Sequence, residues 1–158
     1  MTNKIIDKQY PVLEMYQGMR GEIMEALKDE DLSFQPENCP SLGELCLQIG
    51  EWQQAYIDGF RNFEQNFEWR HPDPSIQGSV ARLAAWYAEL DAELKKVVVA
   101  IPDDAVDNQP IERGGWTASV TWNLDIFKEC LVIFYSKCWV YFKLMGKPLT
   151  KGLEDWLS

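Results

Sequence analysis

Histidine is nearly absent from this sequence of 158 residues. His71 is the single histidine, and the four cysteines include no Cys-X-X-Cys pair. Zinc sites in proteins are built mainly from three or four histidine and cysteine side chains. The inventory therefore argues against a zinc site of the usual kinds. His71 lies in a stretch with two prolines, and we expect it to be an exposed or capping loop residue.

Positive charge is also scarce. Fifteen Lys and Arg residues stand against 25 Asp and Glu residues, which gives a formal net charge of -10. The longest basic run is the pair Lys95 and Lys96. A strongly acidic chain repels the phosphate groups of nucleic acids and of anionic membranes. We therefore expect no nucleic-acid partner.

A hydrophobic run long enough to cross a membrane is missing as well. The most apolar stretch, residues 130–142, is shorter than the roughly 20 residues that a helical span requires. It is also interrupted by Ser136 and Lys137. The first residues, MTNKIIDKQYP, lack the apolar core of a secretory signal peptide. We expect no membrane partner, a cytoplasmic location and free cysteine thiols.

The sequence does contain many apolar and aromatic residues at helical spacing. Hydrophobic residues make up 46% of the chain, and seven are tryptophans. No repeat, low-complexity stretch or linker divides residues 1–158, so we expect one domain. Apolar side chains that recur every three or four residues predict four helices. These cover residues 11–28, 41–67, 79–99 and 117–145.

Local signals mark several ends of these helices. Ser41 and Glu44 have the spacing of a capping box, in which each side chain bonds to the other residue's backbone. Gly146 suits the position just after a helix. Residues 102–117 contain two prolines and a Gly-Gly pair, which predict an irregular connection with at most a short extended piece. The tail from residue 149 is expected to form one further helical turn.

The last predicted helix is apolar on nearly every side. A helix on the surface of a globular protein has one apolar stripe, whereas one that is apolar all round is buried on more than one side. We therefore expect it to pack against the other helices on one face and a second partner on the other. Trp139 and Val140 lie on the outer side, and they predict a homodimer formed through this helix.

Three of these segments resemble the DinB/YfiT-like four-helix bundles. Residues 41–60, SLGELCLQIGEWQQAYIDGF, are similar to the second helix of that family. Residues 79–98 are similar to the third, and residues 116–148 to the last. The resemblance extends from about residue 12 to residue 148. It implies an all-α, DinB/YfiT-like four-helix bundle with a long loop between helices three and four.

The resemblance also implies a lost metal site. The family typically holds a divalent metal with three histidines, one from the second helix and two spaced i and i+4 on the fourth. The matching positions here are Gln48, Cys130 and Phe134. A glutamine amide is a poor ligand for a transition metal, and phenylalanine is none. We therefore expect no metal ligands, no cofactor and no catalytic residues of the family type.

Two functions are open at this point. The first is a non-catalytic or small-ligand-binding protein with a degenerate metal site. The alternative is a metal-dependent hydrolase or thiol-transferase-like enzyme of the same superfamily that uses non-histidine residues. Four residues are the candidates for lining a ligand pocket: Gln48, Trp52, Cys130 and Phe134.

The alternative needs an acid, a base or a nucleophile near that pocket. Glu51, Asp125 and Glu129 are the nearest acidic residues. In such an acidic chain we interpret them as parts of solvated helix faces. Cys130 would need a neighbouring histidine or cation to become a reactive thiolate. We interpret it as a buried, unreactive thiol, which favours the first function.

Overall fold

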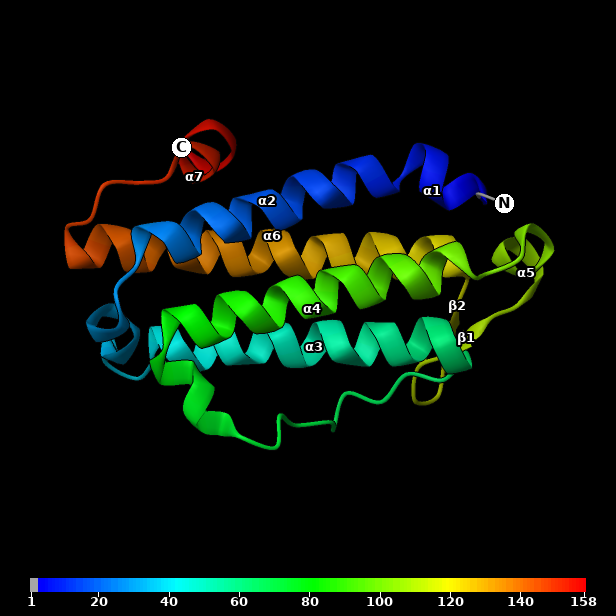
Figure 1. The fold of residues 1–158 in the computed structure, drawn as a ribbon, viewed down its shortest axis with the longest axis horizontal. Helices are drawn as coiled ribbons and strands as arrows, with labels where there is room; N and C mark the ends of the chain where they lie inside the picture. The colour runs from blue at the N-terminus through cyan, green and yellow to red at the C-terminus, as the bar shows by residue number, and fades with distance from the viewer. Residues whose placement is uncertain (1–2) are drawn as a thin grey trace.

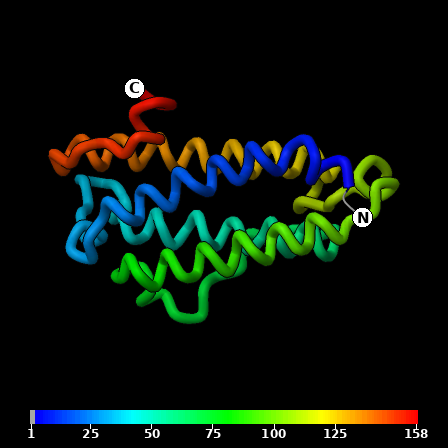
Figure 2. Tube along the Cα trace, turned by 45° about the horizontal axis from the view of Figure 1, so that its top comes forward, coloured from blue at the N-terminus to red at the C-terminus, as the bar shows by residue number. Residues whose placement is uncertain are grey.

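The computed structural model describes residues 3–158, which are predominantly helical. Within this range the chain forms seven α-helices, two 3-10 helices and one two-stranded sheet. The four longest helices are α2 (Tyr10–Ala26), α3 (Leu42–Asn62), α4 (Val80–Val99) and α6 (Val120–Met145). They run side by side along the longest axis of the molecule (Figure 1, Figure 2). The prediction of an all-α fold is confirmed.

Shorter elements lie around the long helices. The helical ones are α1 (Lys4–Lys8), η1 (Asp29–Ser33), η2 (Pro74–Gly78), α5 (Asp103–Asn108) and α7 (Lys151–Leu157). The strands β1 (Ile111–Glu112) and β2 (Thr117–Ala118) pair antiparallel. They lie at one end of the long helices, beside the start of α6 (Figure 1).

Several predicted helix ends are confirmed. Ser41 and Glu44 form the expected capping box at the start of α3. Ser79 caps α4 by accepting a hydrogen bond from the backbone N–H of Arg82. Gly146 ends α6 in the left-handed conformation, with φ of 67°. Local side-chain chemistry is enough to set these ends.

Two other boundaries were predicted wrongly. The second long helix ends at Asn62 rather than near residue 67, because Phe63 adopts a left-handed conformation with φ of 58°. The chain then runs beside β1, where the N–H of Gln65 donates to the carbonyl of Glu112. The connection over residues 102–117 was also expected to exclude helix, yet it contains α5. Pro102 stands just before that helix, where a proline does not interrupt it.

The core lies between the four long helices. Fully or almost fully buried residues from all four form one cluster, including Leu13, Ile49, Leu94 and Phe127. The helix α6 packs on α2, α3 and α7, but its fully buried residues form a single face. Trp122, Ile133, Val140 and Leu144 on the opposite face are exposed, so the expected burial on more than one side is not found within residues 3–158. Leu153 of α7 is fully buried, which confirms the expected helical turn in the tail.

The helices α3 and α4 approach each other very closely at Gly50. A Cβ atom built on Gly50 would lie 2.2 Å from the ring of Trp86. The tryptophan ring of α4 therefore rests directly on the backbone of α3. This contact fixes the separation of the two helices at that level.

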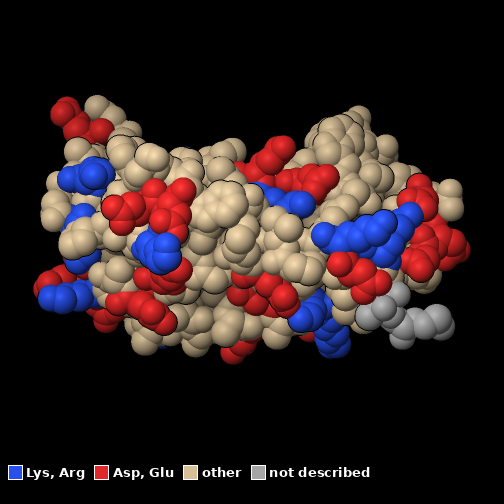
Figure 3. All heavy atoms as spheres, turned by 90° about the horizontal axis from the view of Figure 1, so that it is seen from above, with Lys and Arg blue, Asp and Glu red and all other residues tan. Residues whose placement is uncertain are grey.

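Acidic side chains occur in several groups over the face seen in Figure 3, with basic side chains between them. No continuous basic patch is present on that face. Among residues 3–158, none of the helices is long and apolar enough to span a membrane.

Candidate functional site

The residues predicted to line a pocket lie on the outer seam between α3 and α6. Gln48, Trp52 and Phe134 border one shared crevice, together with Lys137. Its volume is about 10 Å³. That is close to the least space that one water molecule needs.

Cys130 is not among the residues that border this crevice. Its Sγ lies 3.7 Å from the hydroxyl oxygen of Tyr56, and either group can donate. Burial raises the pKa of the Cys130 thiol, and burial also raises the pKa of Tyr56. The thiol is therefore mainly protonated at neutral pH and is a poor nucleophile.

The two fully buried cysteines are no more reactive. Burial raises the pKa of Cys46 to about 12 and holds the pKa of Cys138 well above its usual value. Cys39 is exposed. None of the three buried or half-buried thiols has the activated character that a thiol-transferase nucleophile requires.

No three His, Cys, Asp or Glu side chains in residues 3–158 are grouped as they would be to hold a metal ion. Of the acidic residues named from the sequence, Glu51 lies on α3, apart from Asp125 and Glu129, which border one surface hollow on α6 with Lys128. Glu51 is buried and accepts a hydrogen bond of 3.0 Å from the backbone N–H of His71. Asp125 is paired with Lys128 at 2.7 Å, and Glu129 is exposed.

A buried polar network connects three of the long helices elsewhere. Arg20 of α2 is 1% exposed. Its Nη1 donates to Oε1 of Gln53 on α3, and its Nη2 donates to Oδ1 of Asp91 on α4, both at 2.7 Å. Gln53 also donates to the same carboxylate oxygen at 2.8 Å. Each buried polar group here has a charged or amide partner, which offsets the loss of water.

Sequence reasoning did not identify this network. Position 20 falls on the edge of the apolar stripe of its helix. An arginine at such a position is the one feature of the sequence that points to a buried polar network. A cation on a buried stripe requires an acidic partner from another helix. The periodic pattern alone does not say which of the 25 acidic residues supplies it.

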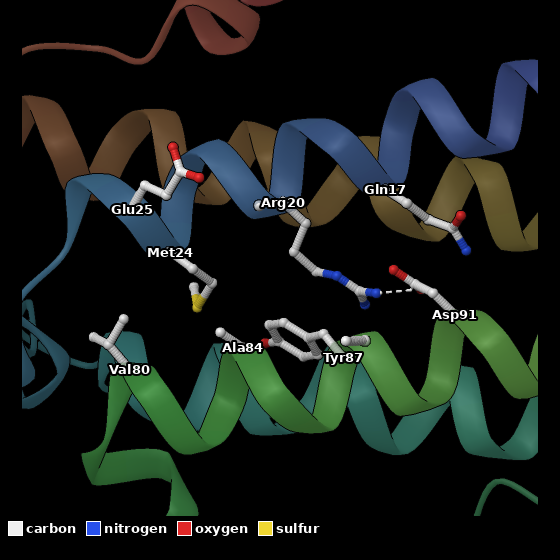
Figure 4. Close-up of a pocket in the computed structure, with 10 residues that line it drawn as sticks. Gln17, Arg20, Met24, Glu25, Val80, Ala84, Tyr87 and Asp91 are labelled. Atoms are coloured by element: carbon white, nitrogen blue, oxygen red, sulfur yellow. Dashed lines mark hydrogen bonds and ion pairs between the residues drawn. The ribbon is translucent and has the colours of Figure 1, made fainter.

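The surface above this network is hollow. A groove of about 420 Å³ runs between α2 and α4 (Figure 4). Arg20, Tyr87 and Asp91 lie between the two helices along it (Figure 4). The groove exists because small residues occupy facing positions, namely Gly21 on α2 and Ala84 and Ala88 on α4.

The groove combines an apolar body with an acidic side chain near each end, Asp91 at one and Glu25 at the other (Figure 4). Met24 and the side chain of Tyr87 supply apolar lining, and the guanidinium carbon of Arg20 lies 4.0 Å from the ring centre of Tyr87. Asp91 accepts its side-chain hydrogen bonds from described residues at Oδ1. Its side chain is 28% exposed. The second carboxylate oxygen can therefore accept a bond from a bound molecule.

Comparison of the sequence with protein-family models found no match, and comparison with curated proteins found none either.

Proposed function

We propose that this chain is a DinB/YfiT-like four-helix bundle that binds a small organic molecule in the groove between α2 and α4. In this proposal it is a binding protein with a degenerate metal site, not a metal-dependent enzyme. The resemblance of residues 41–60, 79–98 and 116–148 to the family motivates the fold assignment. The four long, adjacent helices are compatible with it.

The observation that carries the binding proposal is the groove above the Arg20 network. Its volume of about 420 Å³ is in the range of small-molecule sites, which are mainly apolar with a few fixed polar groups. The ion pair with the buried Arg20 fixes the position of the partly exposed Asp91 carboxylate. A rigid polar group orients a ligand with little loss of entropy on binding.

The charges at the groove select the ligand. Asp91 and Glu25 both border it, and the guanidinium of Arg20 is already occupied by Gln53 and Asp91. An amine can donate to the free oxygen of Asp91, whereas a carboxylate would be repelled. The ligand is therefore a small molecule with an apolar body and an amine head.

The test uses phenethylamine and its neutral analogue phenethyl alcohol as probes. We expect the amine to raise the melting temperature of the protein and to shift backbone NMR signals of α2 and α4 at the groove. The alcohol should bind more weakly because it lacks the charge that Asp91 attracts. Absence of saturable shifts with the amine would rule out the proposal.

Two matched variants locate the binding. Ala88 and Ala85 are both exposed on α4, but only Ala88 borders the groove. Ala88→Trp should fill the groove and abolish amine binding, while Ala85→Trp should retain it. Equal binding by both variants would place the amine elsewhere.

The proposal includes a homodimer formed through the outer face of α6. Ile133, Val140 and Leu144 lie on one side of this helix, and each is at least 45% exposed. Exposed apolar residues on one helix face are typical of a protein–protein contact, and here Ser136 and Lys137 interrupt the row between Ile133 and Val140. Trp139, the other residue expected there, is half-buried and donates from Nε1 to the hydroxyl of Ser158 at 3.1 Å.

A further inference from the structure

Arg113 is the one arginine of five that makes no ion pair with a carboxylate in residues 3–158. The other four are paired with acidic residues: Arg20, Arg61, Arg70 and Arg82. Arg113 lies in the loop between β1 and β2, and its side chain is half-buried. In a chain with a net charge of -10, an inward-facing guanidinium without an acidic partner calls for a physical explanation.

Neutral groups occupy one edge of this guanidinium. Its Nη1 donates to Oε1 of Gln65 at 2.7 Å and to Oδ1 of Asn123. Its Nη2 is 3.4 Å from the hydroxyl oxygen of Tyr56, which is a long hydrogen bond. No partner among the described residues neutralises the positive charge of Arg113.

Three buried donor atoms at this place have no acceptor among the described residues. They are Nε of Arg113, Nε2 of Gln65 and Nδ2 of Asn123. Gln65 is 6% exposed and Asn123 is fully buried. Both amides direct their oxygen at Arg113, which leaves their N–H groups without a partner. Buried donors of native proteins are nearly always satisfied, so an acceptor from outside the chain belongs here.

Aromatic rings surround the same guanidinium. Its central carbon lies 4.7 Å from the ring centre of Trp116, 5.2 Å from that of Phe67 and 5.3 Å from that of Tyr56. Trp116 is the outermost of the three, with 44% of its surface exposed. Such rings pack well against the apolar body of an organic molecule.

We propose that Arg113, Gln65, Asn123 and Trp116 form a binding site for a small organic carboxylate, separate from the groove between α2 and α4. The Nε and Nη2 edge of an arginine matches the two oxygens of a carboxylate. The free amide N–H groups supply further donors, and Trp116 covers the apolar part of the acid. Arg113 is the single cation of the cluster, which suits a monoanion better than a phosphate dianion.

In this proposal the Trp116 ring moves off the guanidinium to admit the acid to Nε and then packs on the acid's apolar part. That ring follows Gly114 and Gly115, which have φ values of 74° and 106°. Glycine populates such conformations without strain, which lets the turn between β1 and β2 place Trp116 over Arg113. The site opens at the hairpin and leaves the long helices in place.

The experiment is an NMR titration of the labelled full-length protein with benzoate and with its neutral analogue benzamide. We expect benzoate to shift the side-chain N–H signals of Arg113, Gln65 and Asn123 in a saturable manner. Benzamide should shift them little, because it carries no charge. No saturable shift with benzoate would overturn the proposal and leave buried water as the acceptor for these donors. Equal shifts with both probes would also overturn it, because binding would then not depend on the charge of the acid.

Variants give a second readout. Arg113→Gln should weaken benzoate binding by about tenfold to a hundredfold, the range for a hydrogen bond to a charged group. Arg61→Gln, which alters an exposed and already paired arginine, should retain the affinity of the parent protein. If both variants bind benzoate equally well, the assignment to Arg113 is wrong.

Asn123→Asp keeps the test decisive if Arg113→Gln does not fold. The new carboxylate lies next to Arg113 and takes the place of the external acid. We expect this variant to melt at a higher temperature and to bind benzoate at least tenfold more weakly, because a charge-assisted partner is already present. Undiminished binding of benzoate by Asn123→Asp would contradict the proposed site.

Discussion

Arg20 Nη2 lies 2.7 Å from Oδ1 of Asp91, so a buried cation on α2 meets a carboxylate on α4. Gln53 of α3 bonds to both of them. Three of the four long helices are thereby joined at one level by directional bonds. Apolar packing alone tolerates small shifts of one helix along another, whereas these bonds fit one alignment only.

Removal of Arg20 is expected to be severely destabilising. Arg20→Met leaves Asp91 and Gln53 without their shared donor in the interior. Breaking a buried ion pair in this way lowers the free energy of unfolding by about 3–5 kcal/mol. Because the side chain of Asp91 is 28% exposed, we expect a loss near the lower end of that range. Chemical denaturation measures it.

An exposed ion pair supplies the control for that experiment. Glu14 and Lys95 also join α2 to α4, at 2.5 Å, but both side chains are about half exposed. Glu14→Gln should lower the free energy of unfolding by less than about 1 kcal/mol. Similar losses in the two variants would show that burial of Arg20 contributes nothing extra.

Stability should fall as the pH rises above about 9. Burial raises the pKa of Cys46 from 9.0 to about 12, so between these values the unfolded chain loses a proton that the folded protein keeps. The unfolded state then binds fewer protons, and the free energy of unfolding decreases with pH. One such group contributes a slope of about 1.4 kcal/mol per pH unit.

Cys46→Ala tests that dependence. The variant lacks the thiol, so its free energy of unfolding should decline less steeply between pH 9 and pH 12 than that of the parent protein. Urea denaturation at several pH values gives both slopes. Parallel slopes would mean that Cys46 does not contribute to the alkaline loss of stability.

The close contact at Gly50 predicts opposite effects for two glycine substitutions. Gly50→Ala puts a Cβ atom 2.2 Å from the Trp86 ring, and overpacking of this kind lowers the free energy of unfolding by about 1–3 kcal/mol. Gly18→Ala, within α2, meets nothing within 4 Å and should raise it by about 0.5–1 kcal/mol. Thermal melts of the two variants show whether each substitution lowers or raises the stability of the protein. Stabilisation by both would refute the close approach of α3 and α4.

The proposed homodimer predicts that charge on α6 disrupts self-association. Val140→Glu places a carboxylate in the exposed apolar row, and burial of that charge in an interface is unfavourable. We expect sedimentation to show a monomer. Val99→Glu is the control, since Val99 is a similarly exposed valine on α4. A parent protein that is itself monomeric at the concentrations tested would contradict the dimer.

The parts of the fold that follow from neighbouring residues were predictable from the sequence. Ser41 and Glu44 meet across a single helical turn, and Gly146 relieves strain at its own position. The apolar period that placed the long helices is likewise a property of each segment alone. Such signals need no knowledge of the rest of the chain.

The features of the structure that were not predicted depend on residues that are far apart in the sequence. The end of α3 is set where Phe63 and Gln65 bond to the backbone of Glu112, far along the sequence. Arg20 is 33 residues from Gln53 and 71 from Asp91. Periodicity shows that a position is buried, but it does not show which groups meet there. The groove and the network around Arg20 were therefore not predicted.

The contact between Gly50 and Trp86 has a consequence for how sequences of this fold can diverge. Neither position is free to change alone, because a larger residue at 50 collides with the ring and a smaller residue at 86 leaves a hole above the glycine. Exchange at one position is tolerated when the other compensates in volume. Related chains that share this helix pairing should therefore show residues 50 and 86 varying together, with their summed size nearly constant.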